Sequence, residues 1–147
     1  MVARVVTVAF DGVEARRVDV EVQQVATPQG AFAIVGLPDK AVAESRERVR
    51  GAFAGIGLAL PPKKVIANLA PADLPKGGSH FDLPIALALL ASMGVIGQDA
   101  LDGWAAIGEL GLDGQIARVG GALMYRRATL GAADSFDRQH AKSAFHA

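Results

Sequence analysis

The residues of this 147-residue chain that could do chemistry crowd into one turn, "PKGGSHFD". A serine becomes a nucleophile when a nearby base takes up its proton, so Ser79 with Lys76 or His80 would form a candidate peptidase site. Neighbouring residues of one loop rarely reach the geometry that such a proton transfer requires. A well-capped turn before a helix is therefore the simpler interpretation of this stretch.

Glycine and lysine before a helix can also bind phosphate. A phosphate-binding loop needs glycine, four residues, and then Gly-Lys-Ser or Gly-Lys-Thr, which brings the lysine to the start of the helix. Here Lys76 precedes Gly77 and Gly78, and the motif occurs nowhere else in the sequence. We therefore expect no nucleotide and no other cofactor to bind this chain.

Three arginines alternate with two glutamates between positions 44 and 50. On a helix, such a segment is typical of a solvated, ion-paired face, and the alternative is a contact with another subunit or with nucleic acid. The candidate contact surface comprises Arg46, Arg48, Arg50, Lys76, Gly77, Gly78 and His80. The three histidines, at positions 80, 140 and 146, lack metal-ligand spacing, so no metal site is expected.

The composition excludes several classes of function. The chain has no cysteine, which rules out disulfides, thiolate catalysis and zinc–thiolate sites. Its 15 basic and 15 acidic side chains cancel, so no overall charge attracts nucleic acid or an anionic membrane. The longest apolar run, 83–93, is too short to span a bilayer, and no secretory signal is apparent. These features predict one cytoplasmic domain with a core of small aliphatic residues.

Apolar periodicity predicts the elements that must position the turn. Two valine-rich strands flank Asp11-Gly12 as a hairpin, and a second hairpin turns at Asp113-Gly114 with type I′ geometry. Asp39 and Asp82 are the expected N-caps of two helices. The predicted elements are strands at 2–10, 13–25 and 31–38, a helix at 39–56, a strand at 64–71, a helix at 83–93 and a hairpin at 104–119. This order predicts an α+β fold with both helices on one side of a sheet.

Three long motifs, "VGLPDKAVAESRERVRGAF", "NLAPADLPKGGSHFDLPIAL" and "IGELGLDGQIARVGGAL", add a family resemblance. Together they resemble the N-terminal region of the YifB/ComM family of Mg-chelatase-like AAA+ ATPases, from about Val5 to Leu123. That region is similar to the proteolytic domain of Lon protease, a ribosomal protein S5 domain 2-like α+β fold. The resemblance implies such a domain over residues 1–123, with a mainly antiparallel sheet and helices packed on one face. An unrelated two-layer sandwich is the alternative.

The resemblance also implies that this domain is not a protease. The Lon-type nucleophilic serine stands at the start of a helix, where this chain has Asp82. The partner lysine would stand two residues after Gly120-Gly121, where this chain has Leu123. Arg126 and Arg127 cannot replace it, because a guanidinium does not lose its proton at usable pH. We therefore expect no enzymatic activity.

Full-length relatives continue into an ATPase module that uses ATP and Mg²⁺, and this chain stops before it. The resemblance implies assembly as a ring and, as in the best-described members, action on branched DNA, a process linked to natural transformation. The expected function is a non-catalytic assembly or substrate-contact module whose partners are other subunits or DNA, with no membrane and no small-molecule substrate. The alternative is a stand-alone serine peptidase that uses Ser79.

The tail, residues 124–147, departs from the family pattern, which suggests a fragment, a truncation or a frameshifted gene product. From about Ser135 it offers only Phe136 and Phe145 as large apolar groups, nearly on opposite faces of a helix. We expect this part to be poorly ordered or an isolated helix.

Overall fold

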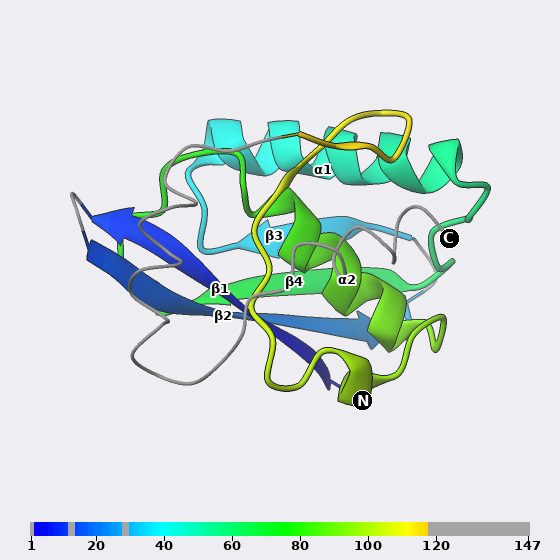
Figure 1. Ribbon diagram of the computed structural model, residues 1–147. Coiled ribbons are helices and arrows are strands. Elements are labelled where there is room, and N and C mark those ends of the chain that lie inside the picture. Colours follow the sequence, from blue (N-terminus) through cyan, green and yellow to red (C-terminus); the bar gives the residue numbers. More distant parts are fainter. Residues whose placement is uncertain (1, 12–13, 28–29, 118–147) are drawn as a thin grey trace.

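The computed structural model describes residues 2–11, 14–27 and 30–117, which form an α+β domain (Figure 1). Its strands are β1 (Val2–Asp11), β2 (Glu14–Val25), β3 (Phe32–Val35) and β4 (Lys64–Ala70). They form one sheet in the order β1-β2-β4-β3. The pairs β1/β2 and β2/β4 are antiparallel and β3/β4 is parallel, so the sheet is mixed but mainly antiparallel, as predicted.

The two helices, α1 (Asp39–Gly55) and α2 (Asp82–Ser92), pack on one face of this sheet. Side chains alternate between the faces of a strand, and in β4 only Val65, Ala67 and Leu69 are buried. They pack with the valines at 18, 20 and 22 of β2 and with both helices in one core cluster. The predicted arrangement of sheet and helices is confirmed.

Helix α2 is the centre of the core. Every residue from Asp82 to Ala91 is buried, which matches its almost purely apolar sequence. A helix that is apolar on all sides needs cover all around. The sheet covers one side and α1 another. The chain that follows α2 returns past it and contributes Leu101, Ala106 and Leu110 to the same core.

Beyond α2 lie a short 3-10 helix, Gln98–Ala100, and the strands β5 (Glu109–Leu110) and β6 (Ile116–Ala117). The last two form the predicted second hairpin, but its turn differs from the prediction. Gly111 and Gln115 close it through a 2.8 Å backbone hydrogen bond, which leaves a three-residue loop instead of a two-residue type I′ turn. Asp113 accepts a hydrogen bond from the Gln115 amide, and Gly114 supplies the left-handed residue at φ +84°.

The predicted helix caps are wrong in both helices. The N-cap positions are Pro38 and Phe81, neither of which caps with its side chain, and both aspartates lie inside the first turn. Asp39 stays near the α1 N-terminus, where a negative charge is favourable. Asp82 instead turns its carboxylate toward α1. The predictions for Leu123 and for the tail fall outside the described residues.

Candidate functional site

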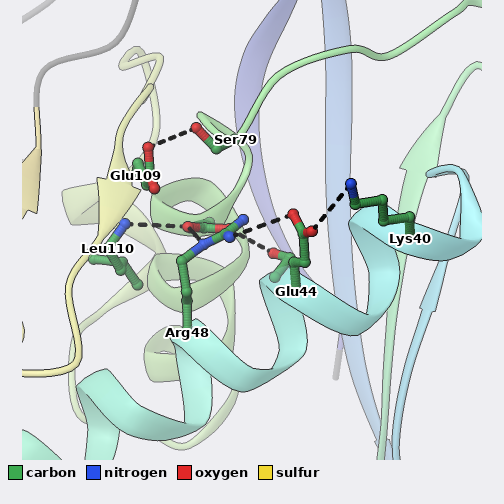
Figure 2. Close-up of polar contacts among 8 residues, drawn as sticks. Lys40, Glu44, Arg48, Ser79, Glu109 and Leu110 are labelled. Carbon is green, nitrogen blue, oxygen red and sulfur yellow. Dashed lines mark hydrogen bonds and ion pairs between the residues drawn. The ribbon is translucent and has the colours of Figure 1, made fainter.

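Asp82, the first residue of α2, is the centre of a buried polar network. Its side chain is only 1% exposed. It accepts four hydrogen bonds: from Ser45 Oγ at 2.7 Å, from Arg48 Nε at 2.5 Å and Nη2 at 3.1 Å, and from the Leu110 amide at 3.1 Å. Figure 2 shows these groups converging from three elements, α1, α2 and β5. One carboxylate therefore joins both helices to the second hairpin.

The sequence of α1 brings the two side-chain donors together. Ser45 and Arg48 are three residues apart and therefore lie on one face of the helix. On its exposed side, Arg48 also lies 3.8 Å from Glu44, which lies 3.9 Å from Lys40 (Figure 2). A row of alternating charges thus leads from the surface of α1 to the buried carboxylate.

Burial and pairing act on the pKa of Asp82 in opposite directions. Burial is the larger effect and raises this pKa, while the hydrogen bonds from Arg48, Ser45 and the Leu110 amide lower it. The hydrogen bond to Asp82 is the main cause that raises the pKa of Arg48. A buried carboxylate without a partner is costly, so Arg48 is the group that makes Asp82 tolerable at this depth. With four donors on two oxygens, this carboxylate is held as an ion-pair partner.

The structure does not bring the candidate nucleophile to a suitable base. Ser79 Oγ donates to Glu109 Oε2 at 2.7 Å. Lys76 Nζ donates to the carbonyl oxygens of Pro71 at 2.5 Å and Leu74 at 3.0 Å. Its pKa is lowered, mainly by burial. Within the described residues, neither Lys76 nor His80 is hydrogen-bonded to Ser79.

Part of the candidate contact surface is not on the surface. Lys76 and His80 are each only 3% exposed, because both side chains turn inward to satisfy backbone carbonyls. Arg48 is engaged with Asp82, and Arg46 Nη1 donates to the Phe32 carbonyl of the edge strand β3. The exposed members are Arg50, Gly77 and Gly78.

A shallow pocket of about 330 Å³ lies beside the buried lysine. It is lined by residues 36–38, which lead into α1, and by residues 72–76, which lead toward α2. Two of the three sequence motifs therefore meet at this hollow. Among the described residues, no three acidic or histidine side chains are grouped closely enough to hold a metal ion. No helix in the described part of the chain has the length and apolarity to cross a membrane.

His80 lies against the phenyl rings of Phe10 and Phe81, with ring centroids 5.2 and 4.1 Å away. Its Nε2 lies 2.7 Å from the Val8 carbonyl oxygen, and therefore carries the donated hydrogen. Burial is the main influence on the ring and lowers the pKa of His80 below 6.5, while the Val8 hydrogen bond and the charge of Asp82 oppose that shift.

The domain should therefore lose stability in mild acid. In the unfolded chain the His80 ring takes up a proton near its ordinary pKa, whereas the folded ring does so only at lower pH. Between these two values the unfolded state holds more protons, so the free energy of unfolding falls as the pH drops below about 6.5. Urea unfolding at about pH 7.5 and about pH 5.5 measures this fall. His80→Gln, which keeps a donor for the Val8 carbonyl, should show a smaller fall; equal falls would contradict the assignment to His80.

Comparison with known proteins identifies the class to which this fold and site belong. The family described as subunit ChlI of Mg-chelatase matches residues 18–135, so the chain belongs to that family. The match begins within β2 and includes both helices and the second hairpin, and hence the whole Asp82 network.

Three relatives place the chain more narrowly. It is 45% identical over 112 residues to the uncharacterised protein YifB of Escherichia coli and 41% identical over 112 residues to the competence protein ComM of Haemophilus influenzae. It is also 37% identical over 120 residues to the uncharacterised protein Rv2897c of Mycobacterium tuberculosis. The resemblance to the YifB/ComM family is confirmed. These alignments cover 76–82% of this chain but only 22–24% of each relative, so the chain spans less than a quarter of their length.

Proposed function

We propose that this chain is a non-catalytic N-terminal module that supplies assembly or substrate contacts to a Mg-chelatase-like AAA+ ATPase. The observation that carries this proposal is the buried Asp82–Arg48 pair. At the position where a Lon-type protease has its nucleophilic serine, this chain has an acid held by four hydrogen bonds. In this proposal the domain is ribosomal protein S5 domain 2-like, and a former catalytic position joins helices and hairpin.

The chemistry of the site supports a structural role. A nucleophile needs an unencumbered lone pair and a base that takes its proton. The Asp82 oxygens are engaged by donors from α1 and β5, and Ser79 is hydrogen-bonded to a carboxylate. A carboxylate is a weak base toward a serine hydroxyl.

The proposed contact surface is the exposed part of the two sequence motifs that meet at the pocket. It comprises Arg50 on α1 and the Gly77-Gly78 turn, with the pocket lined by 36–38 and 72–76. Its proposed partner is a neighbouring subunit or branched DNA, in keeping with the name competence protein given to ComM. ATP and Mg²⁺ belong to the ATPase part of the longer relatives in this proposal. The proposed location is the cytoplasm.

Purified chain incubated with casein as an unfolded protein substrate should leave it uncleaved, and Ser79→Ala should behave identically. It should neither bind nor hydrolyse ATP. Cleavage by the wild-type chain that disappears in Ser79→Ala would establish the competing peptidase function and remove this proposal. Circular dichroism of the same samples shows whether Ser79→Ala is folded, so that a loss of cleavage is not mistaken for a loss of folding.

A second experiment tests the contact role directly. The chain is titrated against a branched DNA junction and, separately, against a YifB relative that lacks its matching N-terminal segment. Binding to either partner, weakened by Arg50→Glu, is the expected result. Absence of binding to both would argue against a contact module.

A further inference from the structure

The second hairpin is built as a separate unit beside the main sheet. We define the lid as residues 108–117. Its strands pair only two residues each and form their own two-stranded sheet. The residue two positions before the lid, Ala106, is fixed to β1 through a 2.9 Å hydrogen bond from its amide to the Val6 carbonyl. The lid thus begins just after a firmly anchored point.

Within the described part of the chain, four hydrogen bonds join the lid to one short segment, residues 79–83. The Gly108 amide donates to the His80 carbonyl, and the Leu83 amide donates to the Gly108 carbonyl, both at 3.0 Å. The other two are the Leu110–Asp82 and Ser79–Glu109 bonds described above. None of these four bonds involves a residue of β1, β2, β3 or β4.

The tip of the lid lies against α1 on two glycines, one helical turn apart. A Cβ atom at Gly51 would come within 2.4 Å of Leu112 Cδ2, and one at Gly55 within 2.6 Å of the Leu112 carbonyl oxygen. Leu112 itself is 66% exposed. At these two positions the helix presents no side chain that interlocks with the lid, so the tip can leave without rearrangement of α1.

Opening of the lid would leave the buried Asp82 carboxylate with hydrogen-bond partners. Asp82 would lose only the Leu110 amide, and its bonds to Ser45 and Arg48 come from α1 and remain. The high cost of an unpaired buried carboxylate is therefore not incurred. Opening would bring Leu110, which is 1% exposed and belongs to the main core cluster, into water.

We propose that the lid opens as a unit while the four-stranded sheet and both helices stay folded, and that opening uncovers the Asp82–Arg48 pair at the junction of α1 and α2. Segments with few buried contacts open at lower free energy than the core, and the lid has the short pairing and local anchoring of such a segment. In this proposal the lid is a strap that covers the Asp82–Arg48 pair.

Native-state hydrogen exchange on the full chain tests this proposal. The Leu110 and Gly108 amides should exchange through an opening that depends little on denaturant and is faster than the global unfolding reported by the Val20 and Ala67 amides. Ser79→Ala removes the partner of Glu109 and should speed Leu110 exchange by about tenfold. Unchanged Leu110 exchange in this variant would overturn the proposal.

A core variant separates lid opening from global unfolding. Val22 is a buried residue of β2, two positions before Gln24. Gln24 donates to Ser92 at the end of α2 that is opposite the lid, so Val22→Ala changes the core far from the lid. It should speed exchange at Val20 and Ala67 and leave Leu110 unchanged within about twofold, because the open-lid form keeps this part of the core. Equal acceleration at all three amides would show that the lid opens only with the whole domain. Ile34→Val on β3 provides a milder core variant with the same expected outcomes.

Discussion

Replacing Arg48 by methionine should lower the free energy of unfolding by about 3–5 kcal/mol, the range for breaking a buried ion pair from one side. Methionine keeps much of the apolar stem but leaves the Asp82 carboxylate with only Ser45 and the Leu110 amide as donors. The folded state must then either hold an inadequately compensated charge or take up a proton. Urea unfolding at neutral pH measures the loss.

A matched control lies on the same helix. Arg50 is paired with Glu47 at 3.4 Å, but both side chains are largely in water. Arg50→Met should therefore change stability by no more than about 0.5 kcal/mol. Arg48→Lys should fall between the two, because an ammonium keeps the charge but not the two-pronged contact with the carboxylate. Equal small effects of Arg48→Met and Arg50→Met would mean that the Asp82 pair contributes little to stability.

The sheet and the helices follow from the sequence because local patterns determine them. The alternation of valines at 18, 20 and 22 identifies the buried face of β2, and the same period governs β4. The apolar run that begins at Leu83 predicts a helix covered on all sides. Each of these features depends on neighbours within a few residues, so an isolated sequence is enough to predict it.

The role of Asp82 could not be predicted in the same way. An aspartate before an apolar run is a reasonable N-cap, and local rules favour that interpretation. The partner that overrides it, Arg48, is 34 residues away in the sequence. The available signal is indirect: an acid at the first position of an otherwise apolar helix needs a cation from elsewhere, and an arginine near a buried serine on α1 can supply it.

Lys76 and His80 are predicted from the sequence to lie on the surface, but the structure buries both side chains. Polar residues in a glycine-rich turn normally face water, so the sequence predicts that these two belong to a contact surface. Here Lys76 donates to the carbonyl groups of Pro71 and Leu74 just before the turn, and His80 donates to the carbonyl group of Val8 in β1. The unsatisfied backbone groups exist only once the chain is folded, so composition alone does not reveal them.

Gly36→Ala should be among the most damaging single changes, with a loss of about 3 kcal/mol or more in the free energy of unfolding. Gly36 links β3 to α1 at φ +100°, a backbone conformation that side chains oppose. A Cβ atom there would also lie 2.3 Å from the carbonyl oxygen of Leu69 in β4, far inside van der Waals contact. Because both obstacles involve backbone, the segment between β3 and α1 would have to move away from β4.

Substitutions at two other glycines distinguish the cost of a left-handed backbone from the cost of a steric clash. Gly57 has φ +77° with open space around it, so Gly57→Ala should show the conformational cost alone, about 1–2 kcal/mol. Gly77 also faces open space and has no left-handed φ, so Gly77→Ala should be neutral or stabilising by up to about 1 kcal/mol. Thermal or urea unfolding of the three variants should rank the losses Gly36, Gly57, Gly77. If Gly36→Ala lowered the free energy of unfolding no more than Gly57→Ala does, the close approach of Gly36 to Leu69 would not be a determinant of stability.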